Sequence, residues 1–289
     1  MRNLLRTLDS RLRLRARIED SVLTLPNPFF VSSIDPGESR ERLLAVLAEL
    51  SRNGAAAIPN FISADLLGAI HPQIHEAFSR RRPDFVVEFD KIGASSCIRS
   101  DLCVANELGV IATDPHICWI VESYFKRVAY LADIDLRRDP PADLADMERS
   151  SPAAARGYTA NHWHRDQRGR QVKMLVYLTD VTASDNNFAF VPGSHLGQHR
   201  RTSFGESRVS DAEVAKMEVD PVEVFGAAGT AVIFDTNIVH RLRRRMSAST
   251  RDTMTFYYTP GQSLRNIRGI AAARARLTRP GAKVLAGRH

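Results

Sequence analysis

The chain has 289 residues, 44% of them hydrophobic, and carries a formal net charge of +7. This is enough for a full hydrophobic core, and an all-β barrel with added helices can use such a length as one domain. The sequence contains no run of about 18 apolar residues, which argues against a transmembrane helix. Residues 1–21 lack the apolar stretch of a secretory signal, and the three cysteines match no zinc spacing. We therefore expect reduced thiols and a cytoplasmic protein without a membrane partner.

Helical patterns dominate the first part of the chain. Residues 1–50 are predicted to form a helical extension whose last amphipathic segment ends near Gly54. A second helix is predicted from Ser63 to about residue 80, and a third over Pro115–Ala132. The stretch Asp139–Gly157 is rich in Pro, Ala, Ser and Asp, which predicts a long loop of the kind that often serves as a lid.

Residues 158–260 are predicted to form the barrel core. Gln171–Val181 is apolar and β-branched and is predicted to be a buried strand, as is Thr230–Phe234. Between them, residues 198–224 form a predicted insertion with a short helix near Ser210–Met217. The residues after 260 are basic and are predicted to be helical and then frayed.

A His-x-Asp pair lies just before the first of these strands. In an extended segment, His164 and Asp166 point to the same side, so both can reach one metal ion. His240 follows the second strand after a short turn and can supply another imidazole. Two histidines and one carboxylate form the facial triad of non-haem Fe(II) oxygenases, which leaves positions open for a cosubstrate and O2. A His-x-Asp pair alone is a weak signal, and the flanking strands strengthen it.

Four blocks resemble the phytanoyl-CoA dioxygenase family of Fe(II)/2-oxoglutarate-dependent oxygenases. They are the strand, turn and helix of Asn53–Leu67, the Trp-His-x-Asp block Trp163–Gln167, the stretch Tyr177–Gly197 with its Pro-Gly-Ser-His turn, and the distal histidine and arginine strands of Gly229–Thr259. One departure is visible, because Asn187 stands where the family often has glycine. Asn tolerates a positive φ, so the turn can persist.

The resemblance implies a mainly β fold with flanking helices, a double-stranded β-helix or jelly roll of the cupin type. It implies one Fe(II)/2-oxoglutarate oxygenase domain over residues 1–289, with Fe(II) held by His164, Asp166 and His240. In this family an arginine on the strand after the distal histidine binds the far carboxylate of 2-oxoglutarate. Arg251 has the fitting position, and Thr253 shares its strand face and could add a hydroxyl.

The other histidines are assigned no metal role. His162 is interpreted as a residue behind or at the rim of the site, and His195 as a structural turn residue. His71 and His75 have helical metal-pair spacing, but no third ligand accompanies them and Pro72 lies between them, so we interpret them as a helix surface.

Lys173 and Tyr177 alternate with the apolar positions of the strand that follows the His-x-Asp pair. Either one of them reaches the cosubstrate, or both are ordinary sheet residues; the sequence leaves this open. Arg241, Arg243, Arg244 and Arg245 are expected in a loop, where a basic rim would attract an anionic substrate or cosubstrate.

The function that the resemblance implies is that of a dioxygenase using Fe(II), 2-oxoglutarate and O2. It would hydroxylate an unactivated C–H bond of a small molecule and release succinate and CO2. Desaturation, cyclisation or other oxidative tailoring at the same iron centre is an alternative, and a non-catalytic jelly-roll binding protein is another. Asp166 argues against halogenation, because related halogenases have a small residue there. No nucleic-acid-binding motif accompanies the basic runs, and the sequence does not fix the substrate or the oligomeric state.

Overall fold

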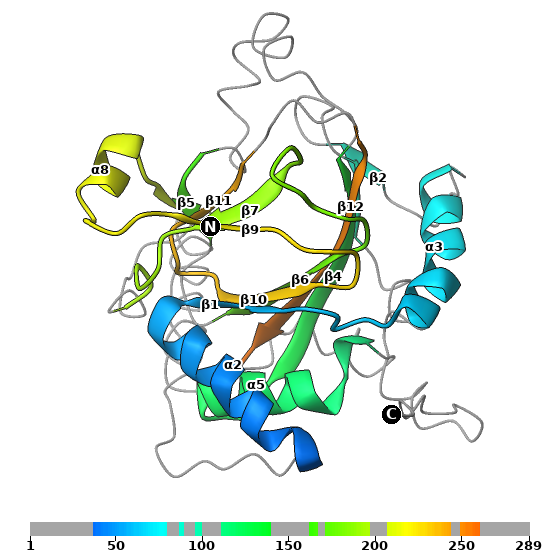
Figure 1. Cartoon of the computed structure of the whole chain (residues 1–289), viewed down its shortest axis with the longest axis horizontal. Helices are drawn as coiled ribbons and strands as arrows, with labels where there is room; N and C mark the ends of the chain where they lie inside the picture. The colour runs from blue at the N-terminus through cyan, green and yellow to red at the C-terminus, as the bar shows by residue number, and fades with distance from the viewer. Residues whose placement is uncertain are drawn as a thin grey trace, which may run out of the picture.

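A computed structural model describes residues 37–79, 87–89, 96–99, 111–139, 162–166, 171–196, 207–243 and 249–260. The strands among these residues form two facing antiparallel sheets (Figure 1). The larger has the order β1-β10-β6-β12-β4-β3-β2 and the smaller has the order β8-β5-β11-β7-β9. This is the double-stranded β-helix that the sequence analysis expects.

The larger sheet is assembled from strands far apart in sequence. Its strands are β1 (Ala55–Ile58), β2 (Val87–Phe89), β3 (Ser96–Arg99), β4 (Tyr130–Asp139), β6 (Val172–Tyr177), β10 (Ala231–Asp235) and β12 (Arg251–Thr259). In β6 the outward residues face the helices and the inward residues face the barrel. Val172, Met174 and Val176 belong to the outer core, whereas Leu175 and Tyr177 belong to the inner one. Both faces of the strand are therefore buried, which explains its nearly continuous apolar sequence.

The smaller sheet carries the second half of the barrel. It contains β5 (His164–Arg165), β7 (Asn187–Phe190), β8 (Ser207–Arg208), β9 (Val222–Val224) and β11 (His240–Arg243). The short helix α8 (Asp211–Ala215) begins at a capping box in which Ser210 and Glu213 satisfy each other's backbone amides. Arg241 and Arg243 thus belong to a strand, so the expected loop is wrong for these two residues. Arg244 and Arg245 lie outside the described residues.

Three longer helices accompany the larger sheet (Figure 1). They are α2 (Arg40–Asn53), preceded by the single turn η1 (Gly37–Ser39), then α3 (Ala64–Ser79) and α5 (Pro115–Phe125). The predicted ends of the first two are confirmed, since Gly54 caps α2 at φ 83° and Ser63 Oγ accepts a hydrogen bond from an amide of the first turn of α3. His71 and His75 are exposed on α3, as expected.

The third predicted helix is too long. The helix α5 ends at Phe125, and Lys126 takes a left-handed conformation at φ 53°. The chain then enters β4 at Tyr130, so the end of the predicted segment is strand rather than helix. Apolar residues without clear periodicity fit a buried helix and a buried strand equally well, and that ambiguity caused the error.

No helix within the described part of the chain has the length and hydrophobicity needed to cross a membrane. The expected cytoplasmic location stays a prediction.

Candidate metal centre

Two neighbouring strands of the smaller sheet bring the predicted triad together. His240 on β11 lies directly opposite His164 on β5, and their rings are 4.4 Å apart between centroids. Asp166 follows β5 immediately, and its amide donates to the Thr236 carbonyl at 3.0 Å. One ligand atom from each of the three side chains lies within 4.8 Å of the others. The structure therefore places residues 74 positions apart at a single buried point.

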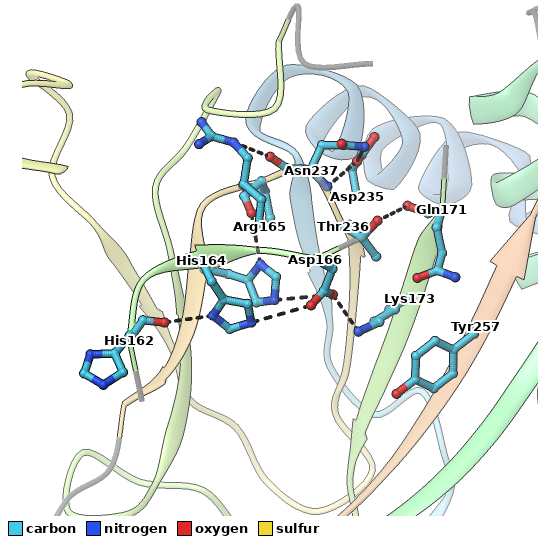
Figure 2. Close-up of polar contacts among 12 residues, drawn as sticks. His162, His164, Arg165, Asp166, Gln171, Lys173, Asp235, Thr236, Asn237 and Tyr257 are labelled. Carbon is cyan, nitrogen blue, oxygen red and sulfur yellow. Dashed lines mark hydrogen bonds and ion pairs between the residues drawn. The ribbon is translucent and has the colours of Figure 1, made fainter. Parts of the chain in front are cut away.

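The imidazoles are oriented by main-chain carbonyls. His164 Nδ1 lies 2.8 Å from the His162 carbonyl, and His240 Nδ1 lies 3.0 Å from the Ile238 carbonyl. A carbonyl only accepts, so both Nδ1 atoms are the protonated donors and both Nε2 atoms keep a free lone pair. Those Nε2 atoms are 3.5 and 3.6 Å from the two Asp166 carboxylate oxygens. Figure 2 shows the His162 ring turned away from Asp166, so this residue contributes its carbonyl to the site.

The electrostatics of the site suit metal ligands. Burial lowers the pKa of His240 from 6.5 to about 3, against the opposing effect of Asp166, so the imidazole is neutral at neutral pH. Burial alone would raise the pKa of Asp166, but Lys173 first and then the two histidines hold it well below its usual range. A neutral imidazole and an ionised carboxylate are the forms that bind a divalent cation.

Lys173 is a cation in contact with this centre. Its Nζ lies 2.5 Å from Asp166 Oδ2 and 4.7 Å from the centroid of the Tyr257 ring (Figure 2). The Tyr257 hydroxyl in turn donates to Asp135 on β4. Lys173 thus lies beside the predicted metal ligands, and its contact with the cosubstrate stays a prediction.

Apolar side chains surround the distal histidine. The rings of Phe188 and Phe234 lie 5.6 and 5.1 Å from the His240 ring, and both belong to the core between the sheets. Apolar rings on this side keep water away from the imidazole and strengthen electrostatic interactions at the centre.

Arg251 and Thr253 both lie on the inner face of β12 and are 4% and 1% exposed. The Arg251 guanidinium is already paired, because its Nη1 lies 2.9 Å from Oδ2 of the fully buried Asp139 on β4. It also lies 5.5 Å from the centroid of the Tyr177 ring. Its Nε is buried and has no hydrogen-bond partner among the described residues.

Arg165, the residue between His164 and Asp166, fixes the local geometry. Arg165 points away from the centre and donates to the Asn237 carbonyl at 2.9 Å and the Ser194 carbonyl at 3.1 Å. The turn before His240 is held by Asp235, which accepts from the Asn237 amide at 2.8 Å and from the Tyr124 hydroxyl of α5 at 2.5 Å.

His195 behaves as the structural turn residue that was expected. It is 2% exposed, and its Nε2 lies 3.3 Å from the Ser51 carbonyl of α2. A Cβ on Gly54 would lie 2.5 Å from His195 Nδ1, so only glycine fits at this helix end.

Sequence reasoning missed Asp139, Asp235 and Arg165. A signal for Asp139 exists in β4, where Asp133, Asp135, Arg137 and Asp139 alternate with Ile134 and Leu136. Such alternation predicts a strand with one polar face. The partners across the sheet, however, depend on the pairing of β4 with β12, more than 100 residues away.

The model of the phytanoyl-CoA dioxygenase family matches residues 50–253 of this chain. The chain belongs to the phytanoyl-CoA dioxygenase family. The match includes all three triad residues and Arg251, and the His-Asp-His cluster is compatible with the iron site of these Fe(II)/2-oxoglutarate-dependent oxygenases. No curated protein sequence matches the chain.

Solved structures agree with the family fold. The epimerase SnoN in complex with Fe3+, alpha ketoglutarate and nogalamycin RO has a TM-score of 0.57 at 15% identity, covering 76% of this chain and 84% of SnoN. The carbocyclase SnoK from nogalamycin biosynthesis has a TM-score of 0.57 at 16% identity, covering 81% and 87%. HygX from Streptomyces hygroscopicus, with nickel, 2-oxoglutarate and hygromycin B bound, has a TM-score of 0.51 at 15% identity, covering 75% and 86%. At these identities the likeness shows a shared fold.

Proposed function

We propose that this protein is an Fe(II)- and 2-oxoglutarate-dependent dioxygenase that hydroxylates an unactivated C–H bond of a small molecule. The observation that supports this most strongly is the buried triad of His164, Asp166 and His240, with both Nδ1 atoms bonded to main-chain carbonyls and both Nε2 atoms directed at the carboxylate. Membership of the phytanoyl-CoA dioxygenase family supports the same chemistry. We further propose that residues 1–289 form one such domain.

The spacing between Asp166 and each of the two histidines fits a single metal ion. Bonds of about 2.1 Å, typical of first-row metals with imidazole and carboxylate ligands, place two donors on one ion at most about 4.2 Å apart. The separations from Asp166 to His164 and His240 are 3.5 and 3.6 Å, within that limit. Two histidines and one carboxylate also suit Fe(II) and leave coordination positions open for other ligands.

Arg251 is proposed to bind the distal carboxylate of 2-oxoglutarate. Its guanidinium is held inside the barrel by Asp139, and its buried Nε retains an unused hydrogen-bond donor. A carboxylate entering the barrel must find such donors, because a buried unpaired charge is costly. Thr253, two residues further along the same face, is proposed to add a hydroxyl donor.

Iron with bound 2-oxoglutarate and O2 would supply the oxidant, with succinate and CO2 as by-products. The protein contributes position and environment. The His162 and Ile238 carbonyls fix the tautomers of the two histidines, and Phe188 and Phe234 shield the distal one from water. These features hold the ligands ready without the rearrangement that a mobile site would need.

The outcome for the substrate is a separate part of the proposal. Hydroxylation adds one oxygen atom to the product, whereas desaturation and cyclisation remove two hydrogen atoms. The names of SnoN and SnoK, an epimerase and a carbocyclase, show that proteins of this fold carry out other conversions. Mass spectrometry of the product distinguishes these outcomes once a substrate is found.

The test is anaerobic addition of Fe(II) and 2-oxoglutarate to the purified protein, followed by O2. We expect a visible metal-to-ligand absorption band before O2 is admitted, and succinate release after it. Asp166→Ala should show neither the band nor succinate. A protein that binds neither iron nor 2-oxoglutarate would contradict the proposal. One that binds both but never releases succinate, across a panel of small molecules, would instead be a binding protein.

A further inference from the structure

The strongest unexplained contact at the metal centre is the one between Lys173 and Asp166. We propose that Lys173 is a positioning residue that makes binding of the metal and binding of the anionic cosubstrate depend on each other. This inference rests on the proposed function, because it assigns a role toward the same iron and 2-oxoglutarate. It concerns a residue that is neither a metal ligand nor the arginine of the cosubstrate site.

Lys173 is placed by the sheet itself. It lies on β6, whose register pairs it with Phe234 on one side and Tyr257 on the other. Its neighbours Val172 and Met174 face the helices, so Lys173 must face the barrel. Only 16% of its side chain is exposed, and its ammonium lies between Asp166 and the Tyr257 ring (Figure 2). A partly buried lysine held in this way cannot swing out to solvent without breaking both contacts.

The position of Lys173 weakens the binding of a metal ion when no cosubstrate is present. Asp166 Oδ2 lies 2.5 Å from Lys173 Nζ and Oδ1 lies 3.5 Å from His164 Nε2, so a metal competes with Lys173 for this carboxylate. The divalent ion then lies a few ångströms from an ammonium in a poorly solvated interior, and like charges at such distances repel strongly. The ion, Asp166 and Lys173 together carry a charge of plus two. The structure thus favours weak binding of metal on its own.

The dianionic cosubstrate reverses this balance. A bound 2-oxoglutarate brings two negative charges, which reduces the total for metal, Asp166, Lys173 and cosubstrate to zero. The Arg251–Asp139 pair adds no net charge to this sum. Because the metal competes with Lys173 for Asp166, metal binding releases the ammonium to pair with the cosubstrate. Lys173 therefore disfavours the metal-only state and favours the state with both ligands. Because coupling between two ligands is reciprocal, the metal must also strengthen cosubstrate binding by the same factor.

A simpler role makes the opposite prediction. If Lys173 only orients the Asp166 carboxylate, its loss weakens metal binding to the same extent with and without cosubstrate. If it acts through its charge, loss of the ammonium strengthens binding of the metal alone. Whether the affinity for metal alone falls or rises when Lys173 is replaced therefore distinguishes the two roles.

The experiment measures Mn(II) affinity from the electron paramagnetic resonance signal of the free ion, without and with saturating 2-oxoglutarate. The chains compared are the wild type, Lys173→Met, Lys173→Gln and Lys173→Arg, with Lys216→Met as the matched control because Lys216 is exposed at the end of α8. Circular dichroism checks that each variant is folded. Lys173→Gln keeps a polar partner for Asp166 and serves if Lys173→Met does not fold.

For Lys173→Met and Lys173→Gln we expect Mn(II) alone to bind about ten-fold more tightly than to the wild type. The strengthening by 2-oxoglutarate should fall by about ten-fold, within the 5–150-fold range typical of coupled sites. Lys173→Arg and Lys216→Met should keep the wild-type coupling. Equal or weaker binding of Mn(II) alone in both neutral variants, or unchanged coupling, overturns the inference. A wild-type protein that binds no Mn(II) under either condition contradicts the proposed function instead.

Discussion

Replacing Asp139 with asparagine separates the structural role of the Arg251–Asp139 pair from its role toward the cosubstrate. Arg251 is 4% exposed and Asp139 is fully buried, so solvent does not screen the pair. Asparagine keeps the shape of the side chain but leaves the guanidinium without this counter-charge. Removing one partner of a buried ion pair costs about 3–5 kcal/mol. For a chain of this size, that corresponds to a fall in Tm of about 6–20 °C.

The same substitution should strengthen cosubstrate binding. In the wild type, the 2-oxoglutarate carboxylate must share Arg251 with Asp139, whereas in Asp139→Asn it finds the guanidinium uncompensated. We expect affinity for 2-oxoglutarate, measured with Mn(II) in excess, to rise by about ten-fold, equivalent to about 1.4 kcal/mol. The cosubstrate should therefore also raise the Tm of the variant more than that of the wild type.

Thermal and urea unfolding measure the loss of stability, and calorimetric titration measures the affinity for 2-oxoglutarate. Asp220→Asn is the control, because Asp220 is exposed and both measurements should stay at wild-type values. A loss of stability below about 1 kcal/mol would show that the pair is not the strong buried contact described here. A large loss of stability with unchanged 2-oxoglutarate affinity would show that another residue binds the carboxylate.

Three other predictions concern His240 and the partly buried thiol of Cys118. His240→Ala should abolish Fe(II)-dependent turnover while the far-ultraviolet circular dichroism persists; normal turnover would remove His240 from the triad. Because the folded state holds the pKa of His240 at about 3 while the unfolded chain protonates near 6.5, the metal-free protein should lose stability as the pH falls below 6.5. The loss at pH 5 should be about 2 kcal/mol in urea unfolding and should be absent in His240→Asn; equal losses in both proteins would refute this assignment. Burial, with Asp114 and Glu122 nearby, raises the pKa of Cys118 to about 12, so at pH 8.5 iodoacetamide should modify it roughly 10³-fold more slowly than in urea. Mass spectrometry of the Cys118 peptide measures both rates, and similar values would contradict the burial of this thiol.

The parts of the site predictable from sequence are those encoded by local spacing. His164 and Asp166 are two residues apart in an extended segment, so their common side follows from strand geometry alone. Arg251 and Thr253 share a face for the same reason. The position of His240 relative to His164 and Asp166 does not follow from spacing. It is predicted from the family resemblance and from the two apolar strands.

The contacts that sequence reasoning could not supply depend on sheet register. Arg251 meets Asp139 because β12 pairs with β4, and Lys173 meets Asp166 because β6 pairs with β10, whose following turn accepts the Asp166 amide. A shift of one residue in either pairing would turn these side chains to the opposite face. The prediction of where α5 ends was wrong for another reason. The helix ends in a left-handed turn at Lys126, and no glycine or proline in the sequence signals that turn.

Arg165 has a consequence for transplanting this site. Its guanidinium joins the strand of the two proximal ligands to the turn before the distal histidine and to the Pro-Gly-Ser-His turn. The His-x-Asp segment, the turn before His240 and the Pro-Gly-Ser-His turn look like independent motifs in the sequence, but hydrogen bonds of Arg165 hold them together. A designer who grafted only the two histidines and Asp166 onto another jelly roll would copy these three side chains but lose the Arg165 hydrogen bonds that set their spacing. The smallest transferable part includes the residue between the ligands and both of the turns that it holds.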